Sequence, residues 1–265
     1  MSDFLHISAL GSGSSGNCLV ISNSRHSLMV DAGFSCRETL RRLSLLSPAP
    51  PAPAAVLITH DHTDHVKGCR VFCDERDIPA GVSQRAAEYL CTKDLLPQKC
   101  FKFEPGSAFE VADFHIRTFP VPHDAMDPVG FVIRSGRFTV GIATDLGEID
   151  SVVLDHLSDC DALILESNYD PELLRSCSRP LRLKRRIAGR HGHLENSAMC
   201  EALPRLLSAR TKLLMLVHLS SECNHPELVE MMARKKLDEL NRPDIVLSVT
   251  DQNCPSGPFL IQGDV

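Results

Sequence analysis

Residues 59–65, with the sequence Thr-His-Asp-His-Thr-Asp-His, concentrate side chains that bind metal. His60 and His62 are two positions apart, and Asp64 and His65 follow at once, so four nitrogen and oxygen donors fall within six residues. One tetrahedral ion does not need so many donors from one short segment. A turn at a strand end can direct His60 and His62 toward one ion, and Asp64 and His65 toward a neighbouring ion. The spacing therefore favours a two-metal hydrolase over a polar turn that happens to be rich in histidine.

Donors from elsewhere in the chain must complete both sites, and His123, Asp145 and His218 are the candidates. Five side chains that can bind metal come just after apolar, strand-like runs, namely Asp31, His60, Asp145, Glu166 and His218. Strand ends that share one rim of a sheet would bring these side chains together. Five such coincidences make one shared site the economical explanation.

The elements that position this site are short. Apolar, β-branched runs predict strands at residues 5–10, 18–22, 27–30, 55–59, 114–121, 130–134, 138–143, 162–165, 212–217 and 245–249. Helical patterns occupy residues 37–46, 84–93, 149–157, 197–207 and 226–240. One Pro/Ala-rich connector spans residues 48–55, and there is no internal repeat. We expect an α/β (α+β) protein with stacked sheets covered by helices, formed as one domain by residues 1–265.

These motifs, in this order, resemble the metallo-β-lactamase superfamily over nearly the whole chain. The resemblance implies a four-layer αββα sandwich with two divalent metal ions. It implies that His60, His62 and His123 hold one ion, that Asp64, His65 and His218 hold the other, and that Asp145 bridges them. Asp31 would orient a ligand histidine. Alternatively, Asp31 is a turn residue before Ala32-Gly33. Nitrogen and carboxylate donors suit Zn, Mn and Fe alike, so the metal stays open.

Composition excludes several classes of protein. The chain is 43% hydrophobic and 23% charged, and no apolar run approaches the roughly 20 residues of a membrane span. The first residues lack a basic region followed by a long apolar stretch, so we expect no signal peptide and a cytoplasmic location. Eleven scattered cysteines without a C-x-x-C pair favour reduced thiols. A net charge of −6 means that an anionic partner must meet a local basic patch.

The ligand set narrows the chemistry. His65 and Asp145 differ from the Arg or Cys common in true β-lactamases of this superfamily, and His62 stands where diiron members carry Glu. Glyoxalase II-like thioesterases and phosphodiesterases or nucleases remain. The loop of residues 11–17 presents Ser12, Ser14, Ser15 and Asn17, which could bind a phosphate, although a simple tight turn explains the loop equally well.

Two further features favour a nuclease. Residues 175–190 are basic without any acidic residue, and we expect a phosphate backbone to bind Arg182, Lys184, Arg185 and Arg186. A solvated surface run is the alternative. Glu166 and His193 resemble the accessory pair of superfamily nucleases, in which His193 binds a phosphate or protonates the leaving group. Alternatively, His193 is a capping or structural residue. Within the superfamily, the chain most resembles the YycJ/WalJ branch, and this resemblance implies a 5′-to-3′ DNA exonuclease. It rests on residues 11–17, 59–65, 166–170, 192–194 and 217–224.

The mechanism that these residues imply is metal-assisted phosphodiester hydrolysis. A hydroxide shared by the two ions attacks phosphorus, Asp64 and Asp145 hold the ions, and His193, steadied by Glu166, assists. A nucleic acid, DNA by resemblance, is the expected partner, and the sequence leaves the oligomeric state open. One alternative is a glyoxalase II-like thioesterase or another small-molecule metallo-hydrolase. Another is a non-enzymatic regulator that binds nucleic acid in a metal-dependent way.

Overall fold

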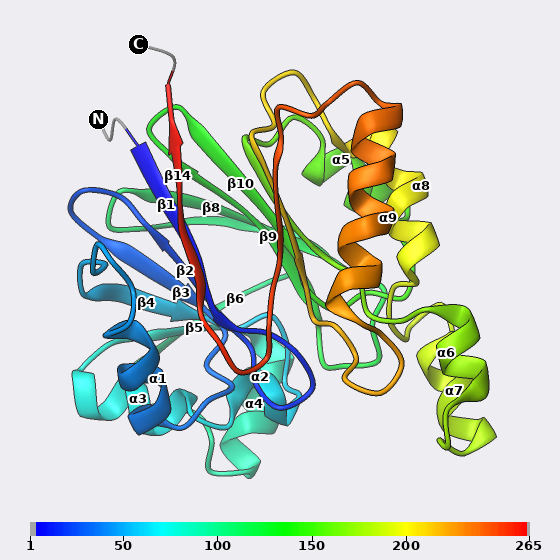
Figure 1. Ribbon diagram of the computed structural model, residues 1–265. Helices are drawn as coiled ribbons and strands as arrows, with labels where there is room; N and C mark the ends of the chain where they lie inside the picture. Colours follow the sequence, from blue (N-terminus) through cyan, green and yellow to red (C-terminus); the bar gives the residue numbers. More distant parts are fainter. Residues whose placement is uncertain (1–3, 264–265) are drawn as a thin grey trace.

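The computed structural model describes residues 4–263, in which fourteen strands form two mixed sheets of seven strands each (Figure 1). The first sheet has the order β14 (Ser256–Gln262), β1 (Phe4–Gly11), β2 (Cys18–Ser22), β3 (Ser27–Val30), β4 (Pro53–Leu57), β5 (Ala80–Ser83), β6 (Cys100–Phe103). The second has the order β13 (Val246–Val249), β12 (Leu213–Val217), β11 (Ala162–Glu166), β10 (Phe138–Ala143), β9 (Val129–Ser135), β8 (Phe114–Pro120), β7 (Ala108–Val111).

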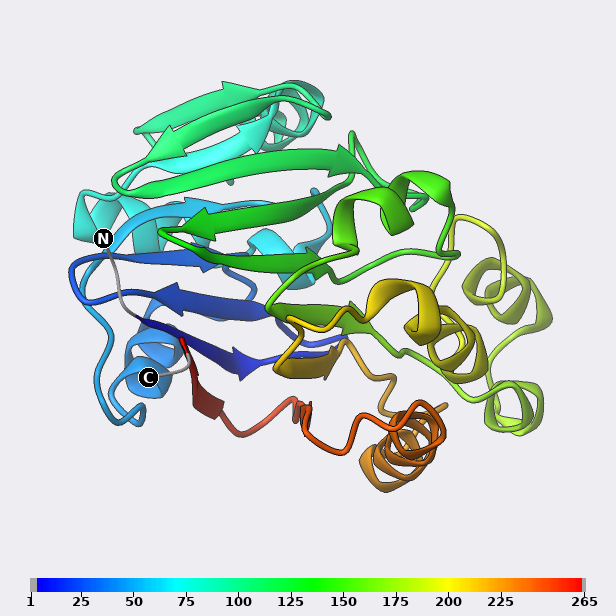
Figure 2. The same ribbon diagram turned by 90° about the horizontal axis from the view of Figure 1, so that it is seen from above.

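Helices cover the outer faces of both sheets (Figure 1). The helices on the first sheet are α1 (Cys36–Leu43), α2 (Thr63–Val66), α3 (Cys69–Arg76) and α4 (Gln84–Thr92). The second sheet carries α5 (Ser151–Leu157), α8 (Asn196–Leu206) and α9 (Pro226–Glu239). Two short helices, α6 (Pro171–Ser176) and α7 (Leu181–Ile187), form a hairpin at the periphery in both views (Figures 1 and 2).

Three apolar cores hold the layers together. Residues such as Ile7, Phe131 and Ile164 fill the space between the sheets. A second core lies between the second sheet and α5, α8 and α9, and a third lies between the first sheet and α1, α3 and α4. Strand β11 is buried along its whole length because it contributes to a core on each face. The predicted αββα sandwich is confirmed.

Strand direction explains where the polar side chains gather. Strands β3 and β4 are parallel, and β10, β11 and β12 are parallel. Parallel neighbours end at the same edge, so residues that follow them share one rim of each sheet. Asp31 follows β3, Asp145 follows β10, and His218 follows β12. The two rims meet at the same end of the sandwich.

The ten predicted strands and five predicted helices are all present, with ends shifted by up to three residues. The sequence did not predict β5, β6, β7, β14, α2, α3, α6 or α7. These missed elements are mostly four to eight residues long, which leaves too little periodicity to recognise. Strand β14 also contains Gly257-Pro258, and proline is tolerated there because the strand is at a sheet edge.

Two broader expectations can also be compared with the structure. All eleven cysteines are free, and most are buried. No helix within residues 4–263 combines the length and the apolarity needed to cross a membrane.

Candidate metal centre

Three histidines form the first half of the centre. Ligand atoms of His60, His62 and His123 all lie within 4.8 Å of one another. His123 Nδ1 donates to the carbonyl oxygen of Gly192 at 2.8 Å, so its Nε2 carries the lone pair. That Nε2 lies 3.3 Å from His62 Nδ1. Two nitrogens bound tetrahedrally to one zinc at 2.0–2.1 Å would be about 3.3–3.4 Å apart, so the spacing suits a shared ion.

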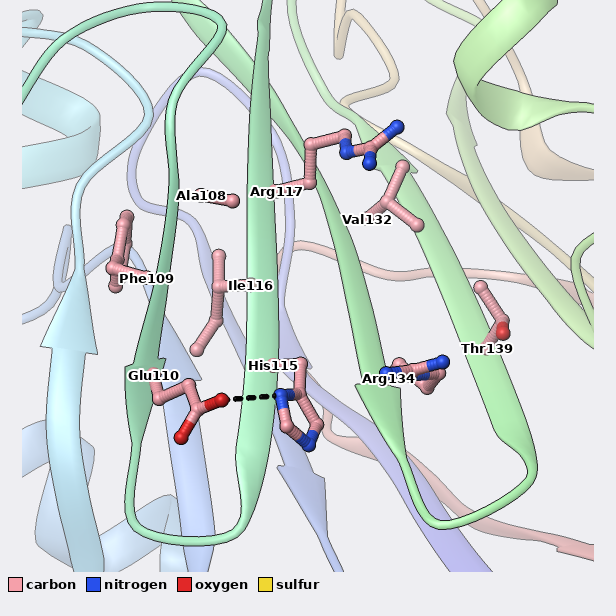
Figure 3. Close-up of a pocket in the computed structure, with 9 residues that line it drawn as sticks. All are labelled: Ala108, Phe109, Glu110, His115, Ile116, Arg117, Val132, Arg134 and Thr139. Atoms are coloured by element: carbon pink, nitrogen blue, oxygen red, sulfur yellow. Dashed lines mark ion pairs between the residues drawn. The ribbon is translucent and has the colours of Figure 1, made fainter.

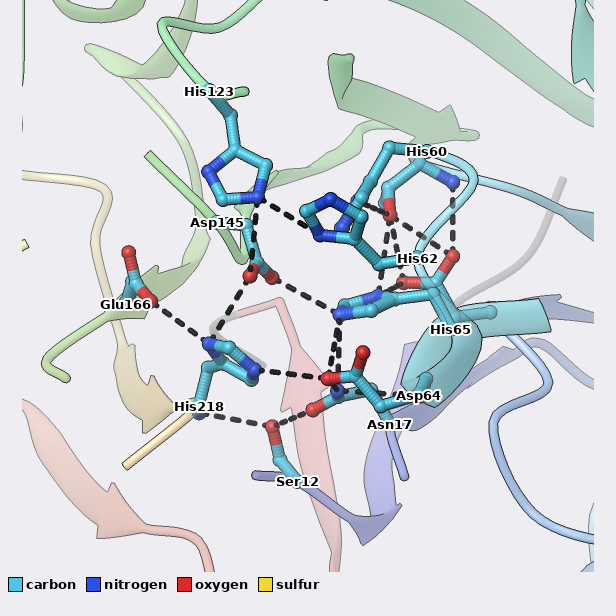
Figure 4. Close-up of polar contacts among 12 residues, drawn as sticks. Ser12, Asn17, His60, His62, Asp64, His65, His123, Asp145, Glu166 and His218 are labelled. Carbon is cyan, nitrogen blue, oxygen red and sulfur yellow. Dashed lines mark hydrogen bonds and ion pairs between the residues drawn. The ribbon is translucent and has the colours of Figure 1, made fainter. Parts of the chain in front are cut away.

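Asp64, His65 and His218 form the second half, and their ligand atoms also lie within 4.8 Å of one another. His65 Nδ1 donates to Asp31 Oδ2 at 2.7 Å, which leaves Nε2 facing the group. His218 Nε2 lies 3.4 Å from Asp64 Oδ2. Each side chain therefore turns one potential ligand atom toward a common point (Figure 4).

Asp145 lies between the two halves (Figure 4). Its Oδ2 is 3.2 Å from His65 Nε2, and its Oδ1 is 3.2 Å from His218 Nδ1 and 3.8 Å from His123 Nε2. Asp145 is 3% exposed, yet within residues 4–263 its Oδ2 has no hydrogen-bond partner. An unsatisfied buried carboxylate oxygen is costly unless a cation binds it. A carboxylate in this position has one oxygen available to each group of donors.

The donor set fits two cations. His60 Nε2 is the other orphaned atom of the centre, buried and unpartnered in the described chain. Burial and the adjacent His65 lower the pKa of His60, so its ring is neutral and can bind metal. Burial raises the pKa of Asp145, but His218 and His65 outweigh burial and hold that pKa well below its usual range. The buried histidines, carboxylates and orphaned atoms are those of a dinuclear site.

Asp31 and Thr59 orient two histidines of the centre through hydrogen bonds. The Thr59 amide and hydroxyl both donate to Asp31, at 2.9 and 3.0 Å to Oδ1. Because the hydroxyl proton goes to Asp31, Thr59 Oγ1 accepts from His60 Nδ1 at 2.9 Å. Asp31 thus orients His65 directly and His60 through Thr59. Sequence reasoning predicted a role for Asp31 and missed Thr59, although Thr59 directly precedes His60.

Ser12 and Asn17 have a different place from the one predicted. Both are buried, and Ser12 Oγ donates to Asn17 Oδ1 and accepts from the His218 amide, at 2.8 and 2.9 Å. Asn17 Nδ2 donates to Asp64 Oδ2 at 3.2 Å. The two side chains therefore hold the metal-site residues, and their hydrogen bonds leave nothing for a phosphate. Ser14 and Ser15 are exposed at the tip of the same loop.

Glu166 and His193 form a hydrogen bond, as their motifs predict, and Glu166 also accepts hydrogen bonds from His218 and from two backbone amides. Its Oε1 accepts from His193 Nδ1 and from His218 Nδ1, each at 2.8 Å. Its Oε2 accepts the amides of Leu146 and Leu194, each at 3.0 Å. Burial lowers the pKa of His193, but the Glu166 carboxylate outweighs burial and raises it. Glu166 binds Nδ1 of His193, so Nε2 of that ring remains available to a ligand.

Comparison with known proteins gives the family. A family model described as the β-lactamase superfamily domain matches residues 26–219. This chain belongs to the metallo-β-lactamase superfamily. It is 32% identical over 238 residues to exodeoxyribonuclease YycJ of Bacillus anthracis, covering 89% of this chain and 90% of that protein. It is 34% identical over 230 residues to exodeoxyribonuclease WalJ of Streptococcus pneumoniae, covering 84% and 85%.

The fold agrees with this family. The crystal structure of the metallo-β-lactamase fold protein YhfI from Bacillus subtilis superposes with a TM-score of 0.71 at 14% identity, covering 97% of this chain and 99% of that one. The chain is thus a metallo-β-lactamase-fold hydrolase with buried His/Asp clusters suited to metal.

In this metallo-β-lactamase hydrolase the basic segment forms the α6–α7 hairpin. Its arginines are not equivalent. Arg186 binds both oxygens of Asp124, and Lys184 Nζ donates to a backbone carbonyl. Arg182 and Arg185 are exposed, and neither makes an ion pair within residues 4–263. Arg182 and Arg185 are therefore the exposed members of the predicted set without an ion pair, and the half-buried Lys184 has no carboxylate partner within residues 4–263 either.

A hollow of about 470 Å³ lies on the outer face of β7–β10 (Figure 3). Arg117 and Arg134 line it, together with a His115–Glu110 ion pair at 2.8 Å. No residue of the metal centre takes part. Sequence reasoning assigned no role to this face, and its side chains are largely exposed.

Proposed function

We propose that this hydrolase is a two-metal phosphodiesterase that degrades DNA from a strand end, in the 5′-to-3′ direction that the resemblance implies. One observation carries the proposal. His193 Nδ1 is bound to Glu166 at 2.8 Å and lies 3.6 Å from Asp145 Oδ1, so an imidazole held by a carboxylate stands beside the metal centre.

We assign the metal ligands as the sequence predicted them. His60, His62 and His123 would hold one ion, Asp64, His65 and His218 the other, and Asp145 both. When bound, the ions would lower the pKa of water to near neutrality and offset the charge that develops on phosphate oxygens. Asp31, Thr59, Ser12 and Asn17 hold the ligands in place before substrate binds.

The chain's own residues then act on the leaving group. An alkoxide that leaves from phosphorus is a strong base and needs a proton donor or a cation, whereas a thiolate leaves readily. His193 Nε2 can donate a proton or a hydrogen bond while Glu166 stabilises the positive ring. A thioesterase does not require such a pair. The pair therefore favours a phosphodiester over a thioester as the substrate.

The preference for DNA has separate support. Two relatives at 32% and 34% identity are named exodeoxyribonucleases. Arg182 and Arg185 offer two unpaired cations on the hairpin that begins beside the centre. Such cations bind a phosphate backbone without reading its sequence.

The test is an assay of internally labelled single- and double-stranded DNA and RNA with Zn²⁺, Mn²⁺ or Fe²⁺. We expect progressive release of nucleotides from DNA ends, lost in His193→Ala and retained in the matched surface variant His115→Ala. Thioester hydrolysis without DNA cleavage would support the glyoxalase II-like alternative. Stoichiometric DNA binding without cleavage, with every metal, would support the non-enzymatic alternative.

A further inference from the structure

Two cysteines from separate parts of the chain meet beside the α6–α7 hairpin. Cys177 lies in the turn between α6 and α7, and Cys223 lies in the loop that joins β12 to α9. Both belong to a small apolar cluster with Tyr169, Leu174 and Ile187. The Cys223 thiol donates a hydrogen bond to the Cys177 sulfur. The two sulfurs are therefore in contact, although α7, α8 and β12 all lie between them in the chain.

The backbone around the two cysteines holds both segments at this contact. Arg179, two residues after Cys177, donates through Nε to Glu222 Oε2 at 3.0 Å. The Asp170 amide, at the start of α6, donates to the carbonyl oxygen of Cys223 at 2.9 Å. The hairpin and the loop are thus fastened to each other on both sides of the two sulfurs.

The two thiols have different reactivity. Cys177 is half-buried, and Cys223 is buried. Burial raises the pKa of the Cys177 thiol, but hydrogen bonds from the Arg179 amide and the Cys223 thiol outweigh burial and lower it. Burial, and then the neighbouring Cys177, raise the pKa of Cys223. Because the thiolate is the form that reacts with oxidants, Cys177 has the character of the attacking cysteine and Cys223 that of the resolving cysteine.

A second pair of thiols in this molecule lacks these properties. Cys69 and Cys73 are one turn apart on α3 and also share a hydrogen bond. Both are buried in the apolar core over the first sheet. The hydrogen bond with Cys73 and burial hold the pKa of Cys69 well above its usual range. A bond between them would also join nothing that the helix does not already hold, so contact alone does not distinguish Cys177 and Cys223.

We propose that hydrogen peroxide converts Cys177 and Cys223 into a reversible disulfide, which pins the α6–α7 hairpin to the β12–α9 loop. Peroxide transfers one oxygen to the Cys177 sulfur: an S–O bond forms, the O–O bond breaks and hydroxide leaves. The Cys223 sulfur then attacks, so that an S–S bond forms, the S–O bond breaks and a second hydroxide leaves. The hydroxides take up the two thiol protons, so two thiols and one peroxide give one disulfide and two waters. A dithiol reverses the step by exchange.

The hairpin is the segment on which this bond acts. It consists of two short helices at the periphery (Figure 1), and its ion pair between Arg179 and Glu222 is largely open to water. A covalent link between separate elements suppresses the local openings that part them. The inference does not depend on the identity of the substrate, because it concerns the thiols and the hairpin alone.

The bond is tested on the reduced, metal-loaded, full-length protein, treated with hydrogen peroxide and then with an alkylating agent. Trypsin, which does not cut before proline, places Cys177 in residues 176–182 and Cys223 in residues 213–234, each without another cysteine. We expect mass spectrometry to find these peptides joined, with the loss of two hydrogens, and separated again by dithiothreitol. Residues 68–70 and 71–76, which hold the buried pair on α3, should stay unjoined.

The rate is compared with that of the exposed Cys91 on α4. We expect the joined peptide to form at least about tenfold faster than Cys91 is oxidised, because thiolate character rather than exposure alone sets the rate. No joined peptide at a peroxide dose that oxidises Cys91 would overturn the proposal.

Variants separate the attacking from the resolving thiol. Cys223→Ser should leave Cys177 as a sulfenic acid, which dimedone traps, and Cys177→Ser should leave Cys223 unmodified. Cys91→Ser is the matched control, in which the joined peptide should form as in the wild type. Dimedone on Cys177 of the wild type, before the joined peptide appears, gives the same assignment without any variant. Dimedone on Cys223 in place of Cys177 would overturn it.

The effect on the hairpin is tested by hydrogen exchange of the reduced and oxidised protein. We expect the amides of α6 and α7 to exchange at least about tenfold more slowly after oxidation, with those of α4 unchanged. Dithiothreitol should restore the original rates. Equal exchange of the hairpin before and after the bond forms would overturn the pinning.

Discussion

Two histidine–glutamate pairs in this molecule have the same separation and opposite surroundings. His193 Nδ1 and Glu166 Oε1 are 2.8 Å apart, as are His115 Nδ1 and Glu110 Oε1. The side chains are 22% and 0% exposed in the first pair, and 51% and 67% exposed in the second. The first pair stands beside the metal centre, since His193 Nδ1 lies 3.6 Å from Asp145 Oδ1, and the second lines the hollow on the outer face of β7–β10 (Figure 3).

Distance alone therefore does not make a functional pair. Water screens the surface pair, and such pairs contribute at most about 1 kcal/mol. Glu166 is out of water and accepts four hydrogen bonds, so the ring it holds is fixed in tautomer and direction. The buried carboxylate also raises the pKa of His193, which favours protonation of the ring on the side of the metal centre. The predictions below test this contrast, from the largest expected effect to the smallest.

The largest effect belongs to the carboxylate between the two ligand groups. We expect Asp145→Ala to lower turnover more than about a thousandfold, because metal-assisted activation contributes several kcal/mol to catalysis. Bound metal should fall in parallel, as measured by elemental analysis of the purified protein. Glu110→Ala should change neither quantity. Full turnover by metal-free Asp145→Ala protein would contradict the ligand assignment.

The next effect separates catalysis from metal binding. His193→Ala should lower kcat by about a hundredfold to ten-thousandfold, the usual contribution of a positioned acid. Its metal content should stay near that of the wild type, because the ligand assignment does not include His193. The paired control is His115→Ala, with unchanged kcat. Equal losses of metal and turnover in His193→Ala would make His193 structural.

The third effect is on stability. Glu166→Ala leaves the buried His218, the half-buried His193 and the amides of Leu146 and Leu194 without their acceptor. We expect a loss of about 3–5 kcal/mol in the free energy of unfolding, as for breaking a buried charged pair. Glu110→Ala should cost less than about 0.5 kcal/mol. Urea unfolding of both variants measures the difference, and similar values would remove the distinction between the two pairs.

The smallest effect lies on the hairpin. Replacing Arg182 and Arg185 together by Met should weaken DNA binding and reduce the slope of log affinity against log salt by about two. Arg117→Met with Arg134→Met, on the outer face, should leave the slope unchanged. Fluorescence anisotropy at several salt concentrations gives both slopes. An equal change in both double variants would place DNA across both faces.

The sequence predicted which potential metal ligands the fold brings together, because that information is local. His60, His62, Asp64 and His65 are neighbours in the chain, and His123, Asp145 and His218 follow strands that apolar runs reveal. The supporting contacts were harder to predict because they depend on backbone direction. Asp31 and His218 have positive φ angles of 64° and 55°, which turn their side chains in a way that residue type does not show.

The Gly-Ser loop shows the same limit. Its hydroxyls suggested a phosphate site, but Ser12 and Asn17 face inward toward His218 and Asp64. The basic segment likewise looked uniform, and only the fold shows which arginines are paired. Arg179 and Ser220 line the same small cavity beside His193. They are far apart in the chain, so no sequence spacing could have predicted that they meet.

The shared acceptor at Glu166 has an energetic consequence. One oxygen, Oε1, receives both His218, a proposed metal ligand, and His193, a proposed substrate contact. Metal at His218 and phosphate at His193 therefore act on the same carboxylate, and their binding free energies are coupled. Because such coupling is reciprocal, bound DNA must change the affinity for metal by the same factor by which metal changes the affinity for DNA.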